Sequence, residues 1–166
     1  ACVYPMLLSS EHPLASVRNS FNAVFVHGDA VDDVMFYGRG AGEFPTASAV
    51  MGDIIDVIRD MVNGCTGRIS NTCYRELPVK KCRDIRSKFF LRMQVENRPG
   101  VLASIASVFG EHKVSINKVV QKIITDGMAE VVIVTDAVKE YHMQDAQEEL
   151  LRMPIVKEIS SVIREY

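Results

Sequence analysis

The sequence predicts an α+β protein of two units: a β-hairpin followed by a long helix, and then a β-α-β-β-α-β unit. The 166 residues are 48% hydrophobic and 24% charged, which suffices for one or two small cores. The hydrophobic period changes from two residues to about 3.6 near Thr46, and both periods recur after residue 88. Residues 64–88 show neither period, so we expect units at 1–63 and 89–166 joined by a linker.

The first unit should begin with strands. An apolar run at 2–8 contains Pro5, which is typical of an edge strand. Residues 21–27 and 33–37 predict two further strands. The polar segment 28–32 between them predicts a turn, so these two strands should form a hairpin.

A glycine-rich turn separates the hairpin from the helix. Gly38, Gly40 and Gly42 have no Cβ, so a planar or phosphorylated ligand could lie directly against their peptide groups. Turns and close packing of a strand on a helix also favour glycine, and the spacing alone leaves both interpretations open. Thr46 is placed to cap the helix that follows.

The helix that begins at Thr46 carries a wide apolar stripe. Its members are Ala47, Val50, Ile54, Val57, Ile58 and Met61, widened by Ala49 and Ile55. Charged side chains such as Asp53 and Arg59 cover the other face, and Asn63-Gly64 should end the helix. Such a stripe requires a large apolar partner, which residues 1–44 are too few to provide.

The second unit has the element order of a ferredoxin-like fold. The predicted elements are a strand at 89–96, a helix at 101–111, strands at 114–123 and 128–135, a helix over 138–153 and a strand at 155–163. Asp126-Gly127 is typical of a hairpin turn, and Pro154 ends the second helix. This order predicts a four-stranded antiparallel sheet with both helices on one face.

The other face of that sheet needs cover. The alternating pattern assigns Phe90, Val120, Val132 and Val162 to it, among polar neighbours. We therefore expect this face, together with the exposed helix of the first unit, to pair with another subunit in a homo-oligomer.

Composition argues against several functional classes. The net charge of −2 and a pI near 6.1 give no reason to expect nucleic acid or a membrane as partner, and no apolar run approaches the roughly 18 residues of a membrane span. Four cysteines at irregular spacing argue against zinc or any metal site and favour reduced thiols in the cytoplasm. No secretory signal is evident, and the chain begins without Met, so we expect an incomplete N-terminus.

Both units resemble known families. Residues 89–166 resemble the ACT domain, a regulatory module that usually binds an amino acid: Asn97-Arg98-Pro99-Gly100-Val101-Leu102 matches its turn and helix start, and Val114-Ser115-Ile116-Asn117 matches its next strand. Residues 1–62 resemble the C-terminal stretch of homoserine dehydrogenase in His12-Pro13-Leu14-Ala15, in Asn22-Ala23-Val24-Phe25-Val26 and above all in Tyr37 to Asp53.

The resemblance implies part of a dehydrogenase substrate and dimerisation domain followed by a regulatory domain. It places Gly38, Gly40 and Gly42 beside the nicotinamide end of NAD(P), and it places the catalytic Asp and Lys upstream of residue 1. We therefore expect a C-terminal piece without catalytic residues, which binds no cofactor tightly and is inactive alone. The parent enzyme would interconvert homoserine and aspartate 4-semialdehyde on the route to threonine, methionine and isoleucine.

An amino-acid effector, with threonine as the expected one, follows from the same resemblance. The turn amides from Arg98 to Leu102, including those of Gly100 and Val101, suit a carboxylate at a helix N-terminus. The side-chain amide of Asn117 suits the polar remainder, and Asn97 completes the predicted site. The plainer interpretations are a solvated turn and a strand-edge hydrogen bond. A free-standing dimeric ACT sensor and a dimerisation module without a ligand stay open as alternatives.

Overall fold

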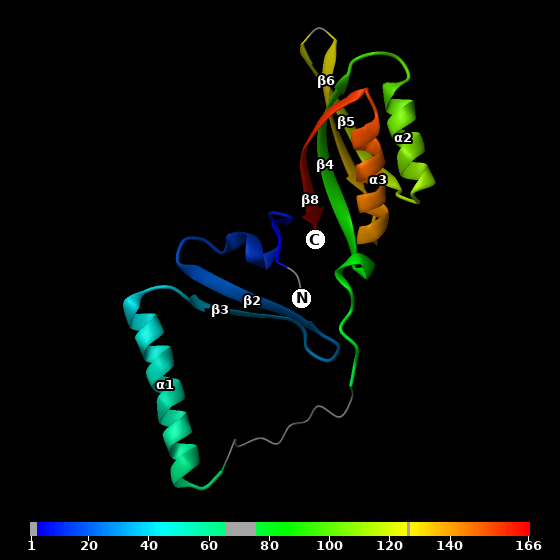
Figure 1. The fold of residues 1–166 in the computed structure, drawn as a ribbon. Coiled ribbons are helices and arrows are strands. Elements are labelled where there is room, and N and C mark those ends of the chain that lie inside the picture. The colour runs from blue at the N-terminus through cyan, green and yellow to red at the C-terminus, as the bar shows by residue number, and fades with distance from the viewer. Residues whose placement is uncertain (1–2, 66–75, 126) are drawn as a thin grey trace. The chain divides into compact units, whose positions relative to one another are not determined.

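The chain divides into two compact units (Figure 1), and the computed structural model describes residues 3–65, 76–125 and 127–166. One unit is Ser9–Leu77, and the other joins the residues up to Leu8 to Pro78–Tyr166. The run at 2–8, expected with the hairpin, thus groups with the second unit. The reason is strand β1 (Met6–Leu7), which pairs in parallel with β8 (Val156–Glu165) at the edge of that unit's sheet.

The predicted hairpin is confirmed. Strands β2 (Phe21–Gly28) and β3 (Asp32–Arg39) pair antiparallel along their whole length. One face is ordered by aromatic contacts, since the rings of Phe21 and Tyr37 stack with centroids 4.8 Å apart. His12, which precedes the short 3-10 helix η1 (Pro13–Ser16), lies 4.8 Å from the ring of Phe25. The opposite face exposes Val24, Val26 and Phe36.

Helix α1 (Glu43–Val62) begins three residues earlier than the sequence predicted. Its N-cap is Gly42 at φ +123°, and Thr46 lies inside the first turn, where its amide donates to the Gly42 carbonyl at 3.2 Å. Pro45 is tolerated here because the first four amides of a helix have no partner within it. The predicted end is confirmed, with Asn63 as C-cap and Gly64 at φ +66°.

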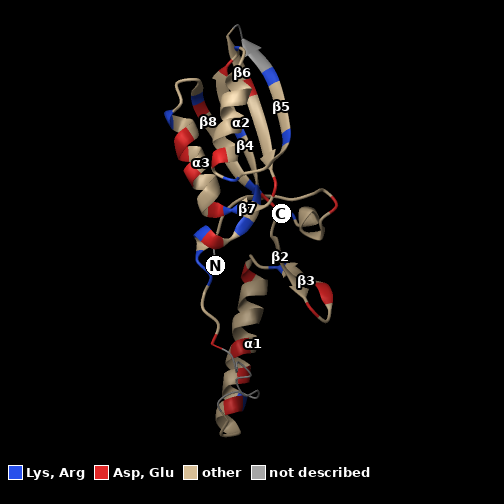
Figure 2. Cartoon of the chain, turned by 90° about the vertical axis from the view of Figure 1, so that its right-hand side faces the viewer, with Lys and Arg blue, Asp and Glu red and all other residues tan. Residues whose placement is uncertain are grey.

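No residue of α1 is buried in the described part of the chain. The stripe residues Val50, Ile54, Val57, Ile58 and Met61 are 44–75% exposed. In the cartoon of Figure 2, α1 is mostly tan, with the charged residues as separate coloured bands along the helix. The expectation that the first unit cannot cover this stripe is confirmed.

The second unit is the predicted α+β sheet with two helices on one face (Figure 1). Its main elements are β4 (Arg86–Glu96), α2 (Val101–Glu111), β5 (Ile116–Thr125), β6 (Met128–Thr135), α3 (Glu140–Arg152) and β8. The strand order is β1-β8-β4-β6-β5, and the pairs of β4, β5, β6 and β8 are antiparallel.

Two short elements at the start of β4 shift the predicted boundaries. A 3-10 helix η2 (Cys82–Asp84) leads into β4, which begins three residues before residue 89. Strand β7 (Val138–Lys139) pairs with Arg86 and Ser87, so Val138 lies in a strand and not in the following helix. The amide of Glu140, the residue after β7, donates to the carbonyl of Ile85, the residue before β4, at 2.9 Å, which adds to the pairing of the two strands.

The core lies between the sheet and its helices. Phe89, Leu91, Met93 and Val95 are at most 1% exposed, as the alternation of this strand predicted. They pack with α2 and α3 side chains; the buried helical members include Ile105, Phe109, Ala146 and Leu150.

The second sheet face differs from prediction at one position. Val132 lies opposite Arg92 on one side and Val120 on the other. The neighbours of Val132 along β6, Val131 and Ile133, are buried, so Val132 and Val120 lie on the open face as expected. Phe90, between the buried Phe89 and Leu91, lies on the open face too. The assignment of Val162 is wrong, because it lies opposite Leu91 and packs against the core. Two register shifts in the β4–β8 pairing break the simple alternation of β8.

Candidate functional site

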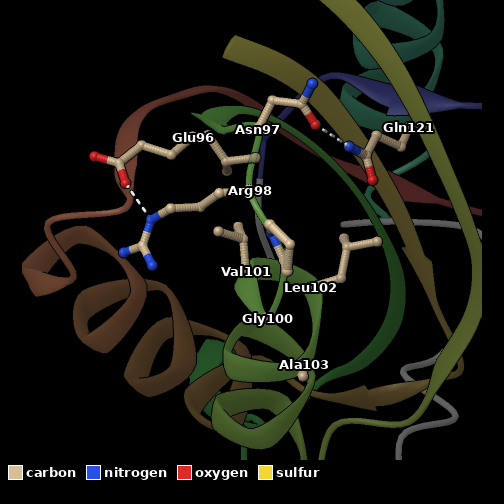
Figure 3. A pocket seen from close by; sticks show the side chains of 10 residues that line it. Glu96, Asn97, Arg98, Gly100, Val101, Leu102, Ala103 and Gln121 are labelled. Carbon is tan, nitrogen blue, oxygen red and sulfur yellow. Dashed lines mark hydrogen bonds and ion pairs between the residues drawn. The ribbon is translucent and has the colours of Figure 1, made fainter. Parts of the chain in front are cut away.

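A hollow of about 420 Å³ lies where β4 turns into α2 (Figure 3). Its lining consists of Val95, Glu96, Asn97, Arg98, Pro99, Gly100, Val101, Leu102, Ala103 and Gln121. Five of the six residues predicted for an effector are therefore brought together: Asn97, Arg98, Gly100, Val101 and Leu102.

Gly100 is the N-cap of α2 and has a left-handed backbone with φ +89°. L-residues other than Asn and Asp seldom adopt this conformation, which accounts for glycine here. A Cβ at Gly100 would have no protein atom within 4 Å. The space beside the turn is thus open to a ligand.

The backbone amides that are free to bind a ligand differ from the prediction at two positions of the turn, 101 and 103. The Val101 amide donates to the Arg98 carbonyl at 3.4 Å, so it is not free. The Ser104 amide donates to the Gly100 carbonyl at 3.0 Å. For Leu102 and Ala103, the described residues provide no backbone acceptor. These two amides, at the positive end of the helix dipole, can receive an anion.

Charged groups of both signs border the hollow. Arg98 Nε donates to Glu96 Oε2 at 2.8 Å, and Lys157 Nζ, from β8, donates to Glu96 Oε1 at 2.9 Å. These two hydrogen bonds hold the pKa of Glu96 below its ordinary value. A guanidinium and a carboxylate are thus next to each other, as recognition of a zwitterion requires.

An amide pair lies on the other side of the helix start (Figure 3). The side-chain Nε2 of Gln121, on β5, donates to Asn97 Oδ1 at 3.2 Å. The backbone amide of Asn97 donates to the Gly127 carbonyl at 2.8 Å. Sequence reasoning missed both Gln121 and Glu96. Glu96 could have been found as the last residue of the strand before the turn, whereas only the sheet pairing brings Gln121 there.

Asn117 does not line this hollow. Its Nδ2 donates to Asp136 Oδ1 at 3.0 Å, and this bond, with one from Ser115, lowers the pKa of Asp136. Asp136 and Ser115 line a separate hollow of about 360 Å³ together with Arg86 and other residues. Within one chain, Asn117 is therefore not brought together with the other five predicted residues.

The glycine turn of the first unit has local structural reasons for two of its glycines. A Cβ on Gly40 would lie 1.8 Å from Asn22 Nδ2, and Gly42 has a positive φ. Gly38 lies in β3 opposite Asn22, and a Cβ there would contact nothing within 4 Å. Close packing and turn geometry thus account for Gly40 and Gly42, whereas Gly38 retains open space.

Residues 3–65, 76–125 and 127–166 contain no group of three or more His, Cys, Asp or Glu side chains placed to hold a metal ion. Across the same ranges, no helix is both long and apolar enough to cross a bilayer.

Comparison with known proteins supports both resemblances. Residues 1–55 match the family model of homoserine dehydrogenase, and residues 89–152 match that of the ACT domain. Homoserine dehydrogenases of Corynebacterium glutamicum and Bacillus subtilis are 43% and 41% identical to this chain over 99% and 98% of its length. The chain carries part of a homoserine dehydrogenase domain followed by an ACT domain. It spans 36% and 38% of the length of those two relatives.

Solved homoserine dehydrogenases share the fold. The crystal structure of the enzyme from Thiobacillus denitrificans matches with a TM-score of 0.83 and 30% identity, over 97% of this chain and 37% of that one. The Staphylococcus aureus enzyme at pH 7.5 matches with a TM-score of 0.54 and 27% identity, over 97% and 36%. The family assignment made from the sequence is therefore confirmed for both units.

Proposed function

We propose that this chain is the regulatory part of a homoserine dehydrogenase and that its ACT unit binds threonine for feedback control. The parent enzyme interconverts homoserine and aspartate 4-semialdehyde with NAD(P), in the pathway to threonine, methionine and isoleucine in the cytoplasm. The observation that carries the proposal is the hollow at the β4–α2 turn, where free amides, Arg98 and Glu96 meet.

The two charged ends of an amino acid have partners in this hollow. The ligand carboxylate accepts hydrogen bonds from the amides of Leu102 and Ala103, in the favourable field of the α2 dipole. Arg98 adds a charged donor when it turns from Glu96, and Glu96 accepts from the ligand ammonium. The amide pair of Asn97 and Gln121 is suited to a hydroxyl.

Asn117 contributes only through a second copy of the chain. Within one chain, its side chain donates to Asp136 and does not line the hollow. β5, which carries Asn117, is the outermost strand of the sheet. Homo-oligomers in which the ACT sheets associate would supply this second copy.

The first unit contributes to the parent's catalytic domain. We assign Gly38, Gly40 and Gly42 to the turn beside the nicotinamide of NAD(P), and Gly38 is the one with open space at its Cβ position. The exposed stripe of α1 packs on the nucleotide-binding domain of the parent. Since the family's catalytic Asp and Lys lie upstream of residue 1, the isolated chain gives no homoserine-dependent reduction of NAD(P).

Thermal denaturation with a panel of amino acids tests the proposal. Threonine raises the melting temperature of the chain, Gly100→Val abolishes the shift, and Asn117→Ala weakens binding by about 1 to 3 kcal/mol. Gly110→Ala, on the solvent side of α2, serves as control and keeps the shift. A shift with another amino acid alone would replace threonine as the effector. No shift with any amino acid would favour a dimerisation module without a ligand.

A further inference from the structure

The ACT sheet contains a strand from the other end of the chain. Met6 and Leu7 of β1 lie opposite Arg164 and Glu165 of β8, and the Tyr166 amide donates to the Leu7 carbonyl at 3.0 Å. The residue after Leu8, Ser9, already belongs to the other unit. One covalent path from the ACT sheet to the dehydrogenase segment therefore has no intervening linker.

Side chains fasten this strand to the interior of the ACT unit. The guanidinium carbon of Arg164 lies 4.0 Å from the ring centroid of Tyr4, just before β1. The same guanidinium donates through Nε to Glu140 Oε2 at 3.0 Å and through Nη2 to Glu140 Oε1. Glu140, the first residue of α3, is only 8% exposed. Arg164 thus joins β1, β8 and α3, and such a half-buried cation on an aromatic ring is worth more than an exposed one.

Strand β8 also borders the effector hollow at its other end. Lys157 and Arg98 bind the two oxygens of the same carboxylate, that of Glu96. A ligand that draws Arg98 away from Glu96 changes the charge balance at the start of β8. The far end of the same strand holds β1.

We propose that β1 is a coupling strand: its docking on β8, fastened by Tyr4 and Arg164, links the state of the ACT sheet to the dehydrogenase segment that begins at Ser9. The inference rests on the proposed function for its regulatory meaning, because only a ligand-binding ACT unit has a signal to send. The docked and released arrangements of β1 are the two states that such coupling needs. A two-residue strand at a sheet edge is a low-stability element and is easily released.

Hydrogen exchange of the 166-residue chain, without any ligand, tests the coupling. Tyr4→Ala removes the ring under Arg164 and leaves the Arg164–Glu140 pair intact, whereas Val3→Ala, at a side chain fully exposed to solvent, is the matched control. We expect Tyr4→Ala to raise exchange of the Leu7 amide, which faces β8, about tenfold and that of the amides in residues 12–17 about fivefold. Core amides such as that of Leu91 stay unchanged and show that the fold is intact.

Three results overturn the proposal: a Leu7 amide that exchanges at the unstructured rate in the wild type, a Leu7 amide unaffected by Tyr4→Ala, or a rise confined to β1. If Tyr4→Ala disturbs the core amides, Tyr4→Leu, which keeps an apolar side chain but removes the ring under Arg164, replaces it with the same criteria. Added threonine reports on the proposed function separately, through the thermal shift. If threonine gives no thermal shift but Tyr4→Ala raises exchange in both β1 and residues 12–17, threonine is rejected as the effector and the coupling strand is retained. If threonine gives the shift but the rise in exchange does not reach residues 12–17, the coupling strand is rejected and threonine is retained.

Discussion

Gly100 has a left-handed backbone conformation that costs a residue with a Cβ more free energy than it costs glycine. Its φ of +89° predicts that Gly100→Ala lowers the free energy of unfolding by about 1 to 2 kcal/mol, although the Cβ itself has room. Gly110→Ala within α2 should raise the same free energy by about 0.5 to 1 kcal/mol, because its φ is not positive and its Cβ meets nothing. Urea unfolding followed by circular dichroism measures both. Equal effects of the two changes would contradict this account of the turn.

Glu96 makes stability depend on pH in a definite direction. Because Arg98 and Lys157 lower its pKa in the folded chain, the unfolded chain binds more protons in acid, and stability falls as the pH decreases below the ordinary value of 4.5. Glu96→Gln removes that part of the dependence, so the urea midpoint should fall less steeply between pH 5 and about 3. Glu148→Gln, at an exposed site on α3, is the control. A Glu96→Gln profile parallel to the wild type would rule out this contribution.

Residues of a local turn could be placed from the sequence, whereas residues that are brought together only by the pairing of strands could not. The turn from Asn97 to Leu102 is local, so its glycine and helix start could be placed from the motif. Gln121 reaches Asn97 only through the register of β5 and β6, which no local pattern encodes. The same cause separates Asn117 from the turn within one chain.

A partly buried ion pair holds β8 against α3. Arg164 and Glu140 side chains are 22% and 10% exposed, so Arg164→Met leaves a buried carboxylate without its cation. We expect a loss of about 3 to 5 kcal/mol in the free energy of unfolding. Arg152→Met breaks an i,i+4 pair whose side chains are more than two-thirds exposed, and it should cost at most about 0.5 kcal/mol. Chemical denaturation of both variants measures the two losses in the free energy of unfolding. Similar losses would contradict the claim that the Arg164–Glu140 pair stabilises the fold more than an exposed pair does.

The exposed stripe of α1 should make the isolated chain self-associate. Ile54 and Ile58 lie one turn apart on the stripe and are both about half exposed. Sedimentation velocity at micromolar concentration should show oligomers for the wild type and a shift toward monomer for Ile54→Glu/Ile58→Glu. Asp53→Asn, on the polar face, should sediment like the wild type. A monomeric wild type would count strongly against an unpartnered α1.

Element types could be predicted because most elements have a clear hydrophobic period. Helix α2 and the hairpin agree with the prediction nearly throughout. Boundaries moved where tertiary contacts take over: β4 extends to Arg86 because β7 pairs with it. Val162 was assigned to the wrong face because register shifts in the β4–β8 pairing displace β8 from the simple two-residue alternation on which the prediction relied.

At the scale of the whole molecule, the chain crosses between its two units twice, at Leu8–Ser9 and at Leu77–Pro78. The sequence indicates the second crossing through its loss of periodicity. The first is invisible in the sequence, because it depends on the contact of residues 6 and 7 with residues 164 and 165, some 158 positions away. Such a non-local pairing has no local signal.

Calorimetric titration of the wild-type chain with threonine tests the central claim most directly. We predict measurable heat and saturation at millimolar threonine or below, with binding lost in Gly100→Val and retained in Gly110→Ala. No heat at millimolar threonine, from a chain whose circular dichroism shows the fold intact, would contradict the claim that the β4–α2 hollow is a threonine site.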